Sequence, residues 1–513
     1  MRCLSDYLEI LDRQGRLARV AASLSCEGEA IELARRLAAK HRRAMLALSP
    51  DEYDTPLAMG LYGSDDLVRA ALAGGWCDED EMAQRLEAAR SAAPAGGWFE
   101  RVVGAVRTTG AKIADRVTDG DSNGSTEANP RKSPAVRQVK RPPCQQVVHL
   151  GDDIDLGRLP VPRIHPGGAT RLLTAALIAT ADPETHQRRL DRADVYLIDR
   201  SHVAIDFAPH EPADRLRRQY RRRREPMPLA ITVGGDPALL PLSVAPLDHS
   251  ADLLDWLSRL RGRPIDIARG RSVDLDITAD AEIVLEGRLE PDGPAQRISQ
   301  RPLYTGLLGR PRRLPIVELS AVTQRVDAIL PAMIRAAGSA HTASEEIVLR
   351  RTAWRLFREQ VRQVVPELVD LDLSPQGDGR NWLVVSIEKE YAGQATRVIH
   401  ALWGWAPSIL ARYIVVVDRR VDVTDPAAVV RAIAQNARPD RDMLRSRGPE
   451  DLHGAACGQG ESMDATSPDF DHSLSRIGID ATTKHSHSVG RPLRTDRATR
   501  RKVDDRWEEY GID

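Results

Sequence analysis

The sequence predicts three domains, α/β at both ends of the chain and mainly β in the middle, on three observations. With 513 residues, the chain is too long for a single hydrophobic core. Residues 143–312 contain short alternating strands bounded by Gly, Pro and Asp, a spacing typical of a β-barrel or sandwich. Helical and strand patterns alternate on either side of this region, which favours α/β layers there.

An N-terminal α/β domain is expected over residues 1–100. Its opening stretch, CLSDYLEILDRQGRLARV, places apolar residues along one helical face. The stretch PLAMGLYGSDDLVRAALAG then predicts a strand, a turn and a helix, with Ser64 well placed to cap the helix.

Two polar segments divide or end the chain. Residues 101–142 carry no apolar stripe and cannot bury enough surface to offset ordering entropy, so a flexible linker or insertion is expected there.

Residues 313–445 return to alternating helices and strands and predict a C-terminal α/β domain with a mostly parallel sheet. The tail, residues 446–513, is expected to be mostly irregular around the segment IGIDAT.

The composition bounds the class of protein. Acidic and basic residues nearly cancel, with a net charge of -1, so no global attraction to nucleic acid is expected. The five cysteines lack CxxC spacing, which argues against a zinc site and fits a reducing cytoplasm. No apolar run approaches the roughly 20 residues that span a bilayer. We therefore expect a soluble cytoplasmic protein.

Several stretches together resemble the UbiD family of decarboxylases. They include LYGSDDLVRAALAG, LLTAALIATADPET, MPLAITVGGDPALLPLSVAPL, LRGRPIDIARGRSVDLDITADAEIVLEG and VVVDRRVDVTDPAAVVRAIAQNARPDRDM, in this order and spacing. The resemblance implies an N-terminal α/β domain, a central split β-barrel like those of flavin reductases, and a C-terminal α/β domain that mediates homo-oligomer formation. It also implies prenylated FMN, held through a divalent metal, acting on aromatic or α,β-unsaturated carboxylic acids.

The residues that bind metal in the family are replaced here. Its metal-binding asparagine corresponds to Arg189, and the glutamate that completes the site corresponds to Leu253. Its histidine falls near Arg215 or Leu216, where His210 is the only imidazole close by. Because a hard divalent cation needs oxygen or imidazole ligands, we expect no divalent metal.

The catalytic positions are replaced as well. The family's substrate-contacting arginine corresponds to Asp194, and its two catalytic glutamates correspond to Ile298 and Leu303. The segment GPAQRISQRPLYTG contains no carboxylate in any register. Proton transfer needs a group that titrates near the working pH, so the catalytic residues of this chain are unknown at this point.

Four residues are candidates for contact with a flavin-type cofactor: Thr174, Arg189, His210 and Arg215. Thr174 matches the family pattern, and Arg189 with Arg215 could grip a phosphate directly in place of the missing cation. The alternative for the run RLRRQYRRRR is a solvated basic helix face. Contact with nucleic acid is not expected, because no aromatic residues accompany the run in the manner of a nucleic-acid patch.

The stretch ITADAEIVLEGRLEP places Glu282 and Glu286 on one face of a strand with Val284, while Ile283 and Leu285 point the other way. We interpret both glutamates as scaffolding on a solvated or ion-paired strand face.

Two functions remain open on the sequence. The first is a divergent UbiD-type carboxy-lyase that acts on a small-molecule carboxylic acid, holds a flavin-like cofactor through arginines and uses an unidentified acid. The second is a non-catalytic paralogue that serves as a partner or scaffold subunit. A homo-oligomer, or an assembly with a UbiD-type relative, fits either function.

Overall fold

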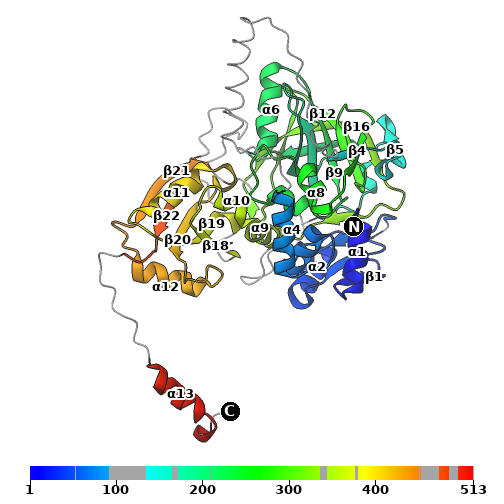
Figure 1. Cartoon of the computed structure of the whole chain (residues 1–513). Helices are drawn as coiled ribbons and strands as arrows, with labels where there is room; N and C mark the ends of the chain where they lie inside the picture. Colours follow the sequence, from blue (N-terminus) through cyan, green and yellow to red (C-terminus); the bar gives the residue numbers. More distant parts are fainter. Residues whose placement is uncertain are drawn as a thin grey trace, which may run out of the picture.

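The fold is described from a computed structural model of the whole chain (Figure 1). The structure describes residues 1–51, 53–91, 135–163, 171–208, 211–335, 344–375, 379–449, 451, 473–484 and 495–511. Most of the predicted linker and part of the predicted tail lie outside these residues. Among the described residues, no helix is both long and apolar enough to cross a bilayer.

The N-terminal sheet is completed by a strand from far along the chain. Its order is β1-β2-β3-β17, and β17 pairs in parallel with β3. These strands are β1 (Leu17–Val20), β2 (Ala44–Ala47), β3 (Leu57–Met59) and β17 (Leu330–Ala332). The helices are α1 (Leu4–Arg13), α2 (Glu29–His41), α3 (Asp65–Ala73) and α4 (Glu79–Ser91). Ser64 stands at the predicted cap position of α3, although its side chain makes no capping hydrogen bond.

The central region is a closed barrel of six strands, as predicted. Strand order around it is β12-β9-β6-β7-β8-β16, and the pairing of β12 with β16 closes the ring. The strands are β6 (Arg171–Ala181), β7 (Arg188–Leu197), β8 (His202–Asp206), β9 (Met227–Val233), β12 (Ile283–Leu289) and β16 (Arg312–Gln324). The apolar side chains of alternating positions fill one continuous core, because successive residues of a strand face opposite sides.

Shorter elements surround the barrel. Strands β5 (Val147–Leu150) and β13 (Ala295–Ile298) pair with β16. Two small sheets join β4 (Val136–Gln138), β10 (Ile265–Arg269) and β11 (Asp276–Thr278), and β14 (Arg301–Pro302) with β15 (Leu308–Gly309). The helices are α6 (Pro212–Arg223), α7 (Leu239–Val244) and α8 (Leu253–Arg261).

The C-terminal region is a second α/β unit with sheet order β18-β19-β20-β22-β21. Its centre, β19-β20-β22, is parallel, and both edge pairings are antiparallel. The strands are β18 (Leu368–Leu373), β19 (Trp382–Ile387), β20 (Tyr413–Asp418), β21 (Met443–Pro449) and β22 (Ser473–Asp480). The helices are α9 (Glu345–Leu356), α10 (Arg358–Arg362), α11 (Gln394–Gly404) and α12 (Pro426–Asn436).

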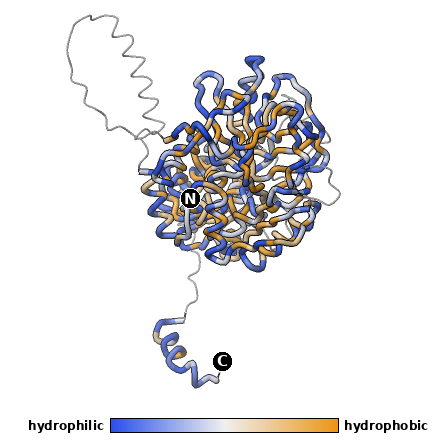
Figure 2. The backbone as a smooth tube through the Cα atoms, turned by 90° about the vertical axis from the view of Figure 1, so that its right-hand side faces the viewer, coloured by the Kyte–Doolittle hydropathy of each residue, from blue (hydrophilic) through white to orange (hydrophobic). Residues whose placement is uncertain are grey.

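Element ends differ from the domain boundaries expected from the sequence. The expected boundary at residue 312 falls on the first residue of the barrel strand β16, and the one at 445 falls inside β21. The IGIDAT segment supplies β22, which pairs on both sides within the C-terminal sheet, so that sheet continues into the expected tail. The reason is physical: pairing with distant strands orders a short segment whose own composition is polar. Beyond it, α13 (Arg497–Asp505) buries no side chain and lies apart from the body (Figure 2).

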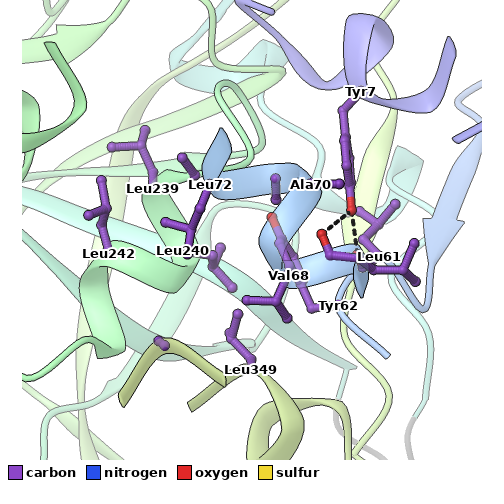
Figure 3. Close-up of a cluster of buried hydrophobic side chains, with 14 of the residues drawn as sticks. Tyr7, Leu61, Tyr62, Val68, Ala70, Leu72, Leu239, Leu240, Leu242 and Leu349 are labelled. Carbon is purple, nitrogen blue, oxygen red and sulfur yellow. Dashed lines mark hydrogen bonds between the residues drawn. The ribbon is translucent and has the colours of Figure 1, made fainter. Parts of the chain in front are cut away.

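One apolar core links the regions. Figure 3 shows side chains from α1, α3, α7 and α9 in a single cluster, with Leu349 of α9 drawn below Val68 of α3. The buried hydroxyl of Tyr7 lies 2.9 Å from the carbonyl oxygen of Leu61 and 2.8 Å from that of Leu67. Leu349 and Ala353 of α9, the first helix of the C-terminal unit, belong to this cluster, so that helix packs against the same core as the N-terminal helices.

Candidate functional site

A cavity lies where the barrel meets the C-terminal unit. Its wall comes from β7, the start of α6, the segment between α7 and α8, helix α9, and the turns at residues 379–381 and 406–408. Its volume is about 110 Å³. That space suits the reacting end of a small molecule, since pockets for whole drug-sized ligands measure roughly 300–1,000 Å³.

Two residues expected at the family's metal positions meet at this cavity. Arg189 on β7 and Leu253 at the start of α8 both line it. The Nη1 of Arg189 donates a hydrogen bond to the carbonyl oxygen of Ala251 at 3.2 Å. Neither side chain offers an electron pair to a cation, so a divalent metal does not fit these two positions. Within the described ranges, no group of three or more His, Cys, Asp or Glu side chains is arranged to hold a metal.

The other predicted cofactor contacts lie elsewhere. Thr174 is buried, and its hydroxyl accepts a hydrogen bond from the backbone N–H of Met333 at 2.7 Å, away from the cavity wall. Arg215 is exposed on α6. His210 lies outside the described residues. Of the four candidates, Arg189 alone among the described ones lines the cavity.

Asp191 is the carboxyl group of the cavity whose protonation is most strongly perturbed. Burial, reinforced by the negative charge of Glu211, raises the pKa of Asp191 to about 7, against a smaller lowering effect of Arg189. Its Oδ2 is shielded from solvent and has no hydrogen-bond partner. A carboxyl group in this state exchanges a proton near neutral pH.

His249 faces the same cavity from the segment between α7 and α8. Burial lowers the pKa of His249, while the carboxylates of Glu211 and Asp248 partly oppose that effect. Its imidazole is therefore neutral at pH 7 and can accept a proton.

Beneath the cavity lies a closed network of buried ion pairs. The guanidinium of Arg335 donates to both carboxylate oxygens of Asp194, at 2.5 and 2.6 Å, and to Glu346 at 3.0 Å. Arg192 also donates to Glu346, at 2.9 Å. Burial alone would raise the pKa of Glu346, but Arg192, Arg335 and Arg350 together lower it to about 2. Asp194, which the sequence was expected to place at the family's arginine position, is thus fixed in an ion pair.

Neither of the two residues expected at the family's glutamate positions lines the cavity. Ile298 is 3% exposed and packs in an apolar cluster with Leu172 and Tyr196. Leu303 is 2% exposed and lies against Gly309, where an added Cβ would come within 2.6 Å of the leucine. These two positions carry packing in this chain.

Glu282, just before β12, and Glu286 within it are fully buried, so the face expected to be solvated or ion-paired is not solvated, and Glu282 instead forms an ion pair with Arg325 at 3.7 Å. The carboxylate of Glu286 accepts hydrogen bonds from the backbone N–H groups of Arg271, Ser272 and Val273 at 2.9, 2.6 and 3.2 Å. Glu282 accepts one from the backbone of Ile329 at 3.1 Å, and burial raises its pKa to about 7. Loops that cover the outer face of the barrel explain the difference.

Sequence reasoning did not single out four polar residues of the cavity: Asp191, His249, Arg350 and Arg380. They come from four separate segments of the chain, and no local motif joins them. The one signal was the gap-free stretch from Arg189 to Asp194, which placed Asp191 two residues from a family site position.

Comparison with known proteins agrees with this architecture. The sequence profiles of the 3-octaprenyl-4-hydroxybenzoate carboxy-lyase N-terminal, Rift-related and C-terminal domains match residues 8–90, 136–337 and 348–481. An uncharacterized protein of Aquifex aeolicus (strain VF5) is 26% identical over 527 residues, covering 100% of this chain and 99% of the relative.

Solved structures with the same fold include two structures of one UbiD-class enzyme and one of a vanillic acid decarboxylase. The enzyme HmfF from Pelotomaculum thermopropionicum in complex with FMN is 25% identical, with a TM-score of 0.71 over 98% of both chains. An evolved dimeric form of HmfF in complex with prenylated FMN is 24% identical, with a TM-score of 0.70 over 98% of this chain and 100% of that one. The vanillic acid decarboxylase of Sedimentibacter hydroxybenzoicus in closed form is 19% identical, with a TM-score of 0.77 over 100% and 99%. The chain therefore belongs to the UbiD family.

Proposed function

We propose that this chain is a UbiD-type carboxy-lyase for an aromatic or α,β-unsaturated carboxylic acid, in which Asp191 carries out the proton transfer of the family's two glutamates. The observation that carries the proposal is the state of Asp191: a shielded carboxyl oxygen without a partner, in a cavity, with a pKa near 7. A general acid works best when its pKa lies near the operating pH.

In the direction of carboxylate loss, Asp191 donates its proton to the carbon atom that has released carbon dioxide. Its carboxylate then recovers a proton before the next turnover, and the reverse direction runs these steps backwards. The neutral imidazole of His249 lines the same cavity and can relay that proton. The apolar side chains of Leu253 and Trp354 in the wall keep bulk water from competing for it.

A flavin is supported by the relatives that contain FMN or prenylated FMN. With Arg189 and Leu253 at two metal positions, the donor set fits a phosphate gripped by a guanidinium rather than through a cation. Arg189 uses one hydrogen bond on Ala251, which leaves most of its donors for a ligand. When bound, the prenylated flavin would supply the electron-accepting ring for carboxylate exchange.

The test uses protein co-produced with a prenyl-flavin synthase. Wild type is expected to retain a chromophore and to release carbon dioxide from a cinnamate-like acid. The Asp191→Asn variant should keep the chromophore and lose about 10²- to 10⁴-fold in rate, the usual contribution of a general acid. Asp292→Asn, at an exposed carboxylate that pairs with Arg221 of α6 and does not line the cavity, is the matched control and should leave the rate unchanged. Equal rates in wild type and Asp191→Asn would exclude this role.

One observation favours a second function, that of a non-catalytic partner or scaffold subunit. Ile298 and Leu303 serve as packing, and Asp194 is locked by Arg335, as suits a non-catalytic partner or scaffold subunit. Colourless protein that copurifies with a UbiD-type relative, and that raises the activity of this relative, would support the second function. Homo-oligomer formation is proposed in both cases and is measured by light scattering.

A further inference from the structure

Arg350 differs from the other arginines of the cavity. Each of these donates a hydrogen bond: Arg189 to Ala251, Arg192 to Glu346, and Arg380 to Asp451. Arg350 donates none to any residue that the structure describes, although its side chain is only 14% exposed. Its Nε is shielded from solvent and has no partner.

The nearest carboxylate, that of Glu346, makes no hydrogen bond with Arg350. An oxygen of Glu346, one turn earlier on α9, lies 3.6 Å from its Nη2, beyond hydrogen-bond length. The carboxylate of Glu346 already accepts hydrogen bonds from Arg192 and Arg335. The carboxylate nearest to Arg350 is thus already hydrogen-bonded to two other arginines, and its attraction offsets only part of the cost of burying the Arg350 charge.

A second cation stands close to Arg350. Arg380, from the turn after β18, lines the same cavity and is fixed by Asp451 and, at 3.3 Å, by Glu211. Burial and the charge of Arg380 both lower the pKa of Arg350. A buried guanidinium without an acceptor, beside another cation, is costly unless an anion joins it.

We propose that Arg350 is the carboxylate-binding residue of this cavity, with Arg380 as the fixed cation behind it. The planar fork of the guanidinium matches the two oxygens of a carboxylate. This assignment deepens the proposed function by naming the group of the substrate that the cavity holds, and it rests on that function for the substrate class alone.

A carboxylate is favoured over a phosphate on grounds of charge and space. At Arg350 itself, the Glu346 oxygen 3.6 Å from Nη2 repels a dianion more strongly than a monoanion, whereas the flavin phosphate is assigned to Arg189 on β7. A phosphate group carries about two negative charges near neutral pH, whereas a carboxylate carries one. The volume of about 110 Å³ accepts the carboxyl end of an aromatic or alkenyl acid.

Calorimetric titration of the full chain, co-produced with the flavin synthase, tests the assignment. The probes are cinnamate, the neutral cinnamamide and inorganic phosphate. Wild type should bind cinnamate about 10- to 100-fold more tightly than cinnamamide, the range expected for hydrogen bonds to a charged group. Arg350→Met should lose this preference, and Arg350→Lys should retain part of it, because the charge remains and the fork does not.

The matched control is Arg358→Met, an exposed arginine at the start of α10 outside this cavity, which should bind cinnamate as wild type does. Arg350→Met should also melt at the same or a higher temperature without ligand, because an uncompensated buried charge has been removed. A purely structural arginine would give a lower melting temperature instead. Equal binding of acid and amide by wild type, cinnamate binding unchanged in Arg350→Met, or an effect on phosphate alone would each overturn the assignment.

Failure of the proposed function gives a different pattern. If both proposals hold, Asp191→Asn should bind cinnamate as wild type does and release carbon dioxide about 10²- to 10⁴-fold more slowly. If wild type binds cinnamate through Arg350 but never releases carbon dioxide, the carboxy-lyase proposal fails and the carboxylate site stands.

Discussion

Two aspartates three residues apart on β7 have opposite surroundings. Asp194 is held by two hydrogen bonds from Arg335 in a closed network, whereas Asp191 keeps an oxygen without any partner. Because side chains alternate along a strand, the two carboxyl groups leave opposite faces of β7. Fixed cations on one face make a carboxylate part of the scaffold. On the other face no arginine donates a hydrogen bond to Oδ2 of Asp191, which leaves this carboxyl group able to exchange a proton with a ligand.

Breaking the closed network should have the largest effect. Arg335→Met leaves Asp194 and Glu346 buried without their shared partner and should cost about 3–5 kcal/mol in free energy of unfolding. Denaturant titration measures this, with the exposed Arg313→Met as control, expected within about 0.5 kcal/mol of wild type. Equal, small losses in both variants would mean that the network contributes nothing to stability.

The pH dependence of protein stability tests whether Asp191, unlike Asp194, has a raised pKa. Its pKa is raised from 3.8 to about 7 in the folded chain, so the folded state binds the proton more tightly than the unfolded state between these values. Its contribution to stability therefore falls as pH rises from about 4 to about 7, and is constant above that. The melting temperature of Asp191→Asn, compared with wild type across this range, should lack this decline. Two parallel curves would contradict the raised pKa.

The smallest effect is expected at Arg215, the arginine that the sequence suggested as a second phosphate contact. Its side chain is exposed on α6 and makes no hydrogen bond or ion pair with the residues that the structure describes. Arg215→Ala should change stability by less than about 0.5 kcal/mol and retain any bound flavin, measured by absorbance after gel filtration. Loss of flavin from this variant, but not from Arg189→Ala, would reverse the two roles.

The sequence predicted the fold more fully than the site. Alternating apolar patterns and family motifs were enough for the three regions and for the arrival of Arg189 and Leu253 at one cavity. Helices were also predicted within residues 313–445, but not that Glu345 and Glu346 in the first turn of α9 are buried, at 2% and 1% exposure. Helical periodicity reports an apolar stripe, whereas the burial of a polar face depends on the neighbouring domain.

The cavity chemistry depends on distances between segments that sequence spacing does not encode. Asp191 gains its raised pKa from burial and from Glu211, on a different element. Arg350 is unusual only because Glu346 is already shared by Arg192 and by Arg335. A run of charges such as SEEIVLRRTAWRL fits a solvated helix face equally well until its partners are placed.

Because β17 pairs with β3, the N-terminal sheet can be completed only after the barrel has been synthesised. On the ribosome, residues 1–91 emerge with the edge of β3 open, and the strand that covers it arrives only after the whole barrel has been translated. An isolated N-terminal fragment would carry that bare edge permanently, exposed to pairing with other chains. We therefore expect the N-terminal region to fold fully only together with the barrel that follows it in the chain.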